Sequence, residues 1–343
     1  MELTDAQDQP LLRLRPANLS DLPALIELQN DALGIYRDIG HARWKYLQNP
    51  SGEAFISIGT NESEDILAGY SMIPIRLNWA GKLYLGAQTT DTVIHPSYRG
   101  RGILKELYQH ATQRASSASV SFAYGFPNSR AISTNIRSIG ATPILTLHGY
   151  YRRIGIRFLL PLCLLREGIC HLVARLRLRT KHNFHSDSKL PIHYDDFWNQ
   201  IKKHQILSVW KDRDFMEWRY SNPTASCPTY YWSEKEGTID AFAITVNKGT
   251  HLYITDLMHA DRNVFSARAL IHFIGMAAVR QRITHLFFLG HDDGFFAAVL
   301  NGFDRLASND VTLVFRPLAS FPPENILTQP TAWVLTASDT DVI

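Results

Sequence analysis

The chain has 343 residues, of which 45% are hydrophobic and 20% are charged, a composition typical of a globular protein and not of a disordered one. A net charge of +3 is too small to favour nucleic acid as a partner, and the length suggests two domains. Cys163, Cys170 and Cys227 have spacings that fit neither a metal site nor an even disulfide framework. We therefore expect no metal and a reducing compartment.

The N-terminal residues 1–10 are acidic and polar, without the basic and apolar regions of a secretory signal. They are expected to be flexible. The longest apolar run, residues 158–165, is far shorter than the ~20 residues that a membrane-spanning helix needs. These features predict a soluble, cytoplasmic protein.

Hydrophobic periodicity and turn signals predict an alternating β-α-β-β-β-α-β-α-β order in the first half of the chain. Gly140 is expected to end the last helix of this series. The pattern indicates a mixed α/β domain over residues 11–153. The expected strands are 11–15, 54–58, 67–77, 82–94, 119–124 and 145–153, and the expected helices are 18–33, 102–116 and 129–139.

Residues 154–190 stand apart by charge, because residues 150–182 hold eight Lys or Arg against Glu167 alone. An apolar stripe at helical spacing predicts an amphipathic helix over 156–179, followed by a polar linker at 180–189. The helix could make peripheral contact with an anionic membrane surface, or it could bridge the domains and bury its stripe. The bridging interpretation is favoured. The stripe comprises Phe158, Leu162, Leu165, Ile169, Leu172 and Leu176.

The second half, residues 191–343, repeats the pattern of strands and helices expected in the first half, which predicts tandem similar domains. Strands are expected at 229–233, 239–247, 251–258 and 285–289, and helices at 265–281 and 293–300. His182, His185 and His193 lack metal-ligand spacing and are interpreted as surface histidines.

The strongest chemical signal is the turn between the expected strand 82–94 and the following helix, which reads Arg99-Gly100-Arg101-Gly102. Glycines let a ligand approach the backbone closely, and the N–H groups at a helix start attract phosphate. Arg99 and Arg101 would add charge-assisted contacts. The alternative is a basic turn that binds nothing.

Residues 93–103 resemble the acetyl-CoA loop of the GNAT acetyltransferases. The pattern of that loop has three fixed positions: Gln or Arg, then Gly after two intervening residues, then Gly or Ala after one more. Arg99 and Gly102 match the first two fixed positions, whereas Leu104 departs from the last and is expected to crowd the cofactor. Residues 124–128, Tyr-Gly-Phe-Pro-Asn, resemble a segment of the two-domain GNAT branch. The resemblance covers about residues 11–153. It implies acetyl-CoA as co-substrate, bound by Val93, Ile94, His95, Arg99, Gly100, Arg101, Gly102, Ile103, Leu104 and Asn128.

The resemblance also implies a mechanism, in which the strands 89–95 and 119–124 splay around the pantetheine arm and an amine attacks the thioester directly. Asp91 is the first candidate base, with a structural carboxylate as an equal alternative. His95 is the second candidate, although a structural hydrogen bond is favoured for it. The family's usual tyrosine acid is absent, and Tyr124 or water would replace it.

The second half has no glycine loop at residues 260–265, so we predict a degenerate GNAT-like domain that does not bind CoA and shapes the acceptor site. Residues 211–223 resemble a stretch of tandem GNAT-like proteins, several of them associated with bacterial polysaccharide assembly. For Trp218, Arg219 and Tyr220, packing is favoured over sugar binding.

Together these features predict an acetyl-CoA-dependent N-acyltransferase whose acceptor is an amine on a small molecule or sugar. The missing tyrosine and Leu104 leave open a catalytically weak CoA-binding or assembly protein. A protein N-acetyltransferase is a third possibility. The sequence fixes neither the acyl chain length nor the oligomeric state.

Overall fold

The computed structural model describes residues 12–155, 159–178, 181–260, 264–291, 296, 298–308, 310–318 and 328–340. The expected flexible N-terminus, 1–10, lies outside these residues. The chain divides into two compact units. Unit 1 holds residues 1–75, 85–143 and 314–321, and unit 2 holds residues 76–84, 144–313 and 322–343.

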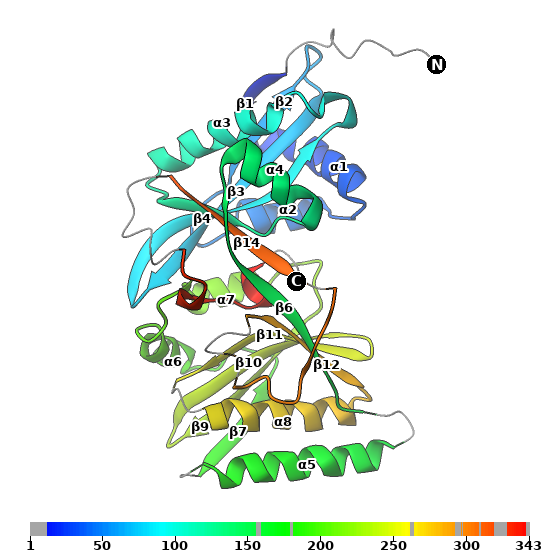
Figure 1. Ribbon diagram of the computed structural model, residues 1–343, viewed down its shortest axis with the longest axis vertical. Coiled ribbons are helices and arrows are strands. Elements are labelled where there is room, and N and C mark those ends of the chain that lie inside the picture. Colours follow the sequence, from blue (N-terminus) through cyan, green and yellow to red (C-terminus); the bar gives the residue numbers. More distant parts are fainter. Residues whose placement is uncertain are drawn as a thin grey trace. The chain divides into compact units, whose positions relative to one another are not determined.

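Unit 1 is built on a mixed sheet with the strand order β1-β2-β3-β4-β5-β14 (Figure 1). β4 and β5 are parallel, and β14 is antiparallel to β5. The strands are β1 (Arg13–Pro16), β2 (Phe55–Thr60), β3 (Ile66–Trp79), β4 (Lys82–Ile94), β5 (Phe122–Gly125) and β14 (Val311–Pro317); the last residues of β3 and the first residues of β4 and β14 belong to unit 2. The helices are η1 (Leu19–Asp21), α1 (Leu22–Leu33), α2 (Ile39–Tyr46), η2 (Pro96–Tyr98), α3 (Ile103–Ser117) and α4 (Ser129–Ile139).

Helices cover both faces of this sheet because neighbouring residues of a strand point to opposite sides. A Cβ atom on Gly69 of β3 would lie 2.6 Å from Leu25 Cδ1, so α1 approaches the sheet closely on that face. The next residue, Tyr70, meets Tyr108 of α3 edge-on, with ring centroids 5.8 Å apart. α1 and α3 therefore lie on opposite faces of unit 1.

Local sequence sets the ends of several helices in unit 1. Asn18 and Asp21 form a capping box ahead of α1. α4 begins and ends at the predicted residues, and Gly140 closes it with a left-handed φ of 65°. The helix α2 was not predicted, although Asp38 caps it by accepting a hydrogen bond from the His41 amide at 2.8 Å.

Unit 2 has a second mixed sheet, with the order β6-β12-β11-β10-β9-β7 and a parallel pair at β11 and β12. Its strands are β6 (Thr142–Arg153), which starts in unit 1, β7 (His182–Asp187), β8 (Leu207–Val209), β9 (Pro228–Lys235), β10 (Thr238–Lys248), β11 (His251–His259), β12 (His285–Gly290), β13 (Asp304–Arg305) and β15 (Trp333–Val334). Its helices are α5 (Leu160–Leu176), α6 (Tyr194–Ile201), α7 (Arg213–Tyr220), α8 (Val264–Arg280), η3 (Pro330–Ala332) and η4 (Ala337–Asp339).

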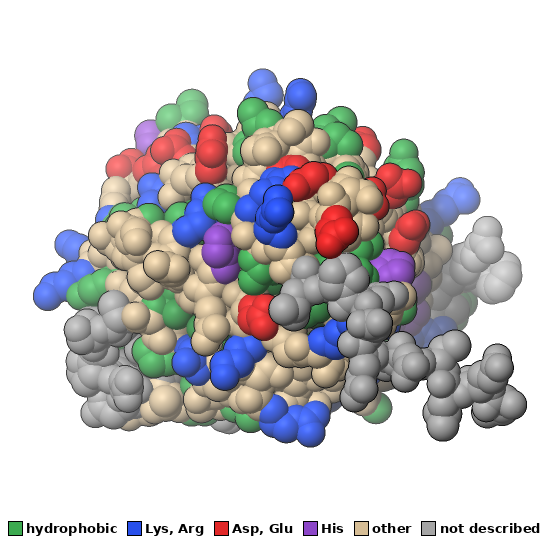
Figure 2. Space-filling view, turned by 90° about the horizontal axis from the view of Figure 1, so that it is seen from above, with side chains coloured by type: hydrophobic (Ala, Val, Ile, Leu, Met, Phe, Trp, Pro, Cys, Tyr) green, Lys and Arg blue, Asp and Glu red, His purple; other side chains and the backbone are tan. Residues whose placement is uncertain are grey.

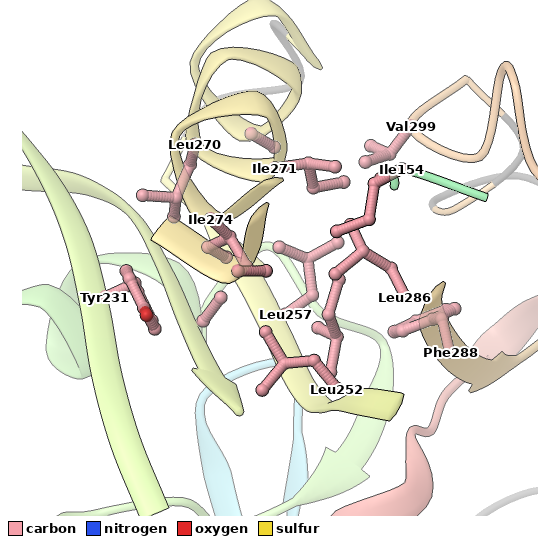
Figure 3. Packing of buried hydrophobic residues seen from close by; sticks show 14 of the residues in the cluster. Ile154, Tyr231, Leu252, Leu257, Leu270, Ile271, Ile274, Leu286, Phe288 and Val299 are labelled. Carbon is pink, nitrogen blue, oxygen red and sulfur yellow. The ribbon is translucent and has the colours of Figure 1, made fainter. Parts of the chain in front are cut away.

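The core of unit 2 lies between α8 and the sheet. Leu270, Ile271 and Ile274 of α8 pack against strand residues such as Leu252 and Leu286 (Figure 3). α5 packs along α8 (Figure 1), and its His171 also meets Phe184 of β7, with ring centroids 4.7 Å apart. Because α8 is covered on two sides, its sequence is apolar almost all round.

The mixed α/β fold class is confirmed, but the units differ from the expected boundaries 11–153, 154–190 and 191–343. Residues 182–187, expected in a linker, form β7, which pairs with β9 along its whole length. Strand pairing also places residues 314–317, far along the chain, in unit 1 beside β5. Half of the expected helix 293–300, residues 293–295 and 297, lies outside the described residues.

Candidate functional site

The glycine-rich turn of unit 1 joins β4, through η2, to α3. Gly100 and Gly102 have φ angles of 79° and 83°, a backbone region that other residues enter only with strain. A Cβ atom at either glycine would meet nothing within 4 Å. The glycines are therefore required by backbone conformation and not by crowding. The space beside them is open to a ligand.

The amides of this turn are available as donors. Among the described residues, the backbone N–H groups of Gly100, Gly102, Ile103 and Leu104 have no hydrogen-bond acceptor. They gather at the N-terminus of α3, where the helix dipole adds a partial positive charge. Such a cradle fits a diphosphate.

The side chains around the turn hold its shape. Arg99 folds back and donates from Nε to the carbonyl oxygen of Ile94 at 3.0 Å. Arg101 lies over the Tyr98 ring, 5.5 Å from its centroid, and Tyr98 is buried in the core. The Leu104 side chain packs against the same core, while its amide remains at the helix start.

The strands beside the turn form a fork. The parallel pairing of β4 with β5 runs from Ala87 to Thr89 and stops where β5 ends at Gly125, whereas β4 continues to Ile94. Five residues of β4, 90–94, thus extend beyond β5. Their other edge faces β3, since the His95 amide beyond them donates to the Leu67 carbonyl oxygen at 2.8 Å.

This geometry refines the expected backbone contacts to a pantetheine arm. The His95 amide is used within the sheet, and the Val93 side chain is buried. Because successive N–H groups of a strand point to opposite edges, the backbone of Ile94 is directed to the open side of the fork. The Arg99 guanidinium lies at the same edge, bonded to the Ile94 carbonyl.

Asp91 lies at a kink of β4 with a φ of 50° and a side chain that is only 4% exposed. Its carboxylate meets Arg37 Nη1 at 2.5 Å, Lys45 Nζ at 2.6 Å and Tyr46 Oη at 2.7 Å. Burial alone would raise the pKa of Asp91, but the Lys45 and Arg37 cations outweigh it and hold the pKa well below its usual range. A carboxylate held in this way is a weak proton acceptor, which favours a positioning role.

His95 and Tyr124, the other candidate catalytic residues, have different surroundings. His95 is partly exposed and caps η2, where its Nδ1 faces the Ser97 amide at 3.4 Å. Tyr124 lies on β5 with its ring buried, edge-on to Phe126 at 6.0 Å. Asn128, expected beside the cofactor, caps α4 by accepting from the Ala131 amide at 3.0 Å.

Arg37, Lys45 and Tyr46 were missed by sequence reasoning. A signal was present, because Trp-Lys-Tyr at residues 44–46, followed by Asn-Pro at 49–50, is echoed by Trp-Arg-Tyr at 218–220 and Asn-Pro at 222–223. The two segments end α2 and α7, respectively. Comparison of the two halves would therefore have pointed to Lys45 and Tyr46.

Unit 2 contains a corresponding fork. The parallel pairing of β11 with β12 stops at Ile254 and Phe288, while β11 continues to His259. Beyond this point Asp256 is fully buried and bonded to Lys211 Nζ at 2.9 Å. Lys211 also meets Asp339 at 2.9 Å. As in unit 1, a buried lysine neutralises an aspartate on the longer strand of the fork.

A pocket of about 360 Å³ opens at the fork of unit 2. Tyr253 and Phe287 line it and stack on each other, with nearly parallel rings whose centroids are 5.1 Å apart. Lys248 and Asp310 also line it. Loop residues 261–263, which follow β11, lie outside the described residues.

No metal site is found in the part of the chain that the structure describes. His182, expected at the surface, is buried and bonded to Asp240 at 2.8 Å. His185 stacks on Trp232, and His193 is exposed beside Asp196. Among the described helices, none is long and apolar enough to cross a bilayer.

Comparison with known proteins agrees with this geometry. The family described as an acetyltransferase (GNAT) domain matches residues 13–136, which contain the turn and the fork. A search of curated proteins gives no match.

Three solved structures show a similar fold. A probable N-acyltransferase from Enterococcus faecalis V583 has 12% identity and a TM-score of 0.64, over 89% of this chain and 72% of its own. A GCN5-related N-acetyltransferase from Kribbella flavida has 14% identity and a TM-score of 0.66, and the match covers 95% of this chain and 75% of that protein. The Saccharomyces cerevisiae N-myristoyltransferase with bound myristoyl-CoA has 15% identity and a TM-score of 0.56, over 91% and 80%. Residues 13–136 of this chain thus match the acetyltransferase (GNAT) domain family.

Proposed function

We propose that the protein is an acyl-CoA-dependent N-acyltransferase and that unit 1 binds acetyl-CoA. The observation that carries the proposal is the pair of left-handed glycines, Gly100 and Gly102, which present acceptor-free amides at the start of α3. The amides would bind the diphosphate, and Arg99 and Arg101 would add positive charge nearby.

The fork supplies the second part of the site. The extended end of β4, with Ile94 directed to the open edge, would pair with the amides of a pantetheine arm as an added strand would. The bound thioester supplies an activated acyl group. The acceptor nitrogen forms a bond to the acyl carbon, the carbon–sulfur bond breaks, and the nitrogen loses one proton while the sulfur gains one.

Proton transfer is assigned from the surroundings of the three candidates. Asp91 is held by Arg37 and Lys45, so we assign it to positioning the kinked strand and not to accepting the proton. His95 is partly exposed at the end of β4 and becomes the first candidate base, directly or through water. Tyr124, on the shorter strand of the fork, remains the candidate acid for the leaving thiolate.

Unit 2 is proposed to be a degenerate GNAT-like domain that shapes the acceptor site and binds no CoA. It has the fork and the neutralised aspartate but no glycine turn. Tyr253 and Phe287 line a pocket of unit 2 that would suit a small-molecule amine, such as an amino sugar, better than a peptide. A cytoplasmic location, where acetyl-CoA is available, belongs to the same proposal.

Calorimetric titration of the full chain with acetyl-CoA tests the cofactor, and release of free thiol with a panel of amines and amino sugars tests the reaction. We expect saturable binding and thiol release that depends on the amine. Binding without thiol release from any amine would instead support a CoA-binding or assembly protein. Absence of binding would overturn both functions.

A further inference from the structure

The helix α5 of unit 2 packs one face against the rest of the unit and exposes a different face that is apolar. Its buried residues, spaced by four, four and three positions, form one stripe against α8 and β7. The buried stripe comprises Cys163, Glu167, His171 and Ala174. A different set of large apolar side chains is exposed: Leu162 by 61%, Leu165 by 59%, Ile169 by 53%, Leu172 by 56%, Val173 by 47% and Leu176 by 76%.

The exposed residues form one continuous stripe. At 100° per residue they fall within an arc of about 100°, centred opposite Glu167. A helix on the surface of a protein normally directs polar side chains to solvent, so an apolar outer stripe of this size indicates a partner. The expectation that a bridging helix buries this stripe is wrong, since burial falls on the other face; Phe158 lies outside the described residues.

Positive charge borders the stripe on both sides. Arg166 and Arg177 lie next to one border and Arg175 next to the other. All three are exposed, although Arg166 also pairs with Glu167 at 3.0 Å, and Arg175 and Arg177 lie over Phe184 and Phe265. Residues 159–178 contain one acidic residue, Glu167, and its side chain is buried against Arg152 and His272. By contrast, the face of the molecule seen in Figure 2 mixes Lys and Arg with Asp and Glu side chains.

We propose that α5 docks the protein on an anionic lipid surface, lying in the plane of the membrane. Its 17 residues span about 25 Å, and the leucine stripe would enter the acyl chains while the flanking arginines meet the lipid phosphates. A second copy of the chain fits this face less well. Pairing two such stripes would bring arginines against arginines, with no exposed carboxylate on the described helix to neutralise them.

Flotation of the full chain with lipid vesicles tests the proposal. We expect binding to phosphatidylcholine vesicles containing phosphatidylglycerol, weaker binding in high salt, and little binding to phosphatidylcholine alone. The double substitution Leu165→Asp and Ile169→Asp should reduce binding by about tenfold or more, because charges replace inserted apolar groups. The matched control is Tyr36→Asp with Ile192→Asp, two side chains that are each 86% exposed elsewhere.

A second pair, Arg175→Gln with Arg177→Gln, should weaken binding to anionic vesicles only. If the Asp variants do not fold, Leu165→Ser with Ile169→Ser replaces them. Failure to float with anionic vesicles, or equal losses in the control, would overturn the proposal. A dimer seen by light scattering without lipid, and dissociated by Leu165→Asp, would assign the face to a second copy instead.

Discussion

The carboxylate of Asp91 lies 2.6 Å from the ammonium group of Lys45, inside unit 1 and at the kink of the strand that leads to the glycine turn. Arg37 adds a second cation and Tyr46 a hydroxyl. The strand end that would carry the thioester is thus fixed by a buried charge cluster. Asp256 and Lys211 repeat the arrangement in unit 2.

We expect Asp91→Asn to lower the free energy of unfolding by about 3–5 kcal/mol at neutral pH, because it leaves the buried Lys45 and the largely buried Arg37 without their anion. Urea unfolding monitored by circular dichroism measures the loss. The control is Asp310→Asn, which removes a carboxylate that is 42% exposed and paired with His148 and Arg305. This change should cost less than about 1 kcal/mol.

The pH dependence of the Asp91 effect follows from the lowered pKa. Burial opposes ionisation, yet Lys45 and Arg37 hold the folded-state pKa below the unfolded value of about 3.9. The stabilisation is therefore present above about pH 4 and is lost as the pH falls through the folded-state value. The difference between wild type and Asp91→Asn should narrow below pH 4, and a constant difference would contradict this account.

Catalytic pH profiles separate positioning from proton acceptance at the same residue. We expect Asp91→Asn to lower kcat at all pH values while the profile keeps its shape. His95→Gln should instead remove the ascending limb of kcat against pH. If Asp91→Asn removes that limb and His95→Gln does not, Asp91 is the base.

Alanine at Gly100 should weaken acetyl-CoA binding by about tenfold, equal to about 1.4 kcal/mol, because the strained backbone turns the amides away from the diphosphate. Gly237 supplies a matched control, since it has a φ of 78° and, like Gly100, open space around its missing side chain. Gly237→Ala should cost similar stability and leave the affinity unchanged. Titration calorimetry compares the two variants. An equal loss of acetyl-CoA affinity in both would contradict a role of Gly100 in binding.

Gly125→Ala should disturb the fork, because the new Cβ atom would lie 2.2 Å from Thr89 Oγ1. We expect a loss of about 1–3 kcal/mol in unfolding free energy, as for other overpacked sites. Adding Thr89→Ala removes the clashing oxygen and should restore much of the loss. A double-mutant cycle by urea unfolding tests the coupling, and simple additivity would contradict it.

Lys211→Met should destabilise unit 2 by about 3–5 kcal/mol, since it leaves Asp256 and Asp339 buried without a cation. Burial, opposed by Lys211, raises the pKa of Asp339 above its usual value, so the folded protein gains little from the charge of this carboxylate. Asp339→Asn should therefore lower the free energy of unfolding by less than Lys211→Met does. Thermal unfolding of the variants checks this order. Lys235→Met, at an exposed lysine, is the control and should change little.

The sequence by itself determined most of the order of elements in the first half of the chain and the position of the glycine turn. Apolar periodicity located β4 and α4 at their observed ends. The glycines marked a tight turn at residues 100–102 and a helix end at Gly140, and the structure has positive φ angles at these glycines. These features depend on residues close along the chain, so a sequence pattern can reveal them.

Only the tertiary structure decided which distant residues meet. Arg37 and Lys45 reach Asp91 from more than 40 positions away, β14 joins β5 from the far end of the chain, and the polar stretch 182–187 pairs as a strand. It also decided which side of α5 is covered: the packed side carries Glu167 and His171, and the leucine stripe faces outward. Periodicity shows that a helix has an apolar face, but packing against a particular neighbour decides which face is buried.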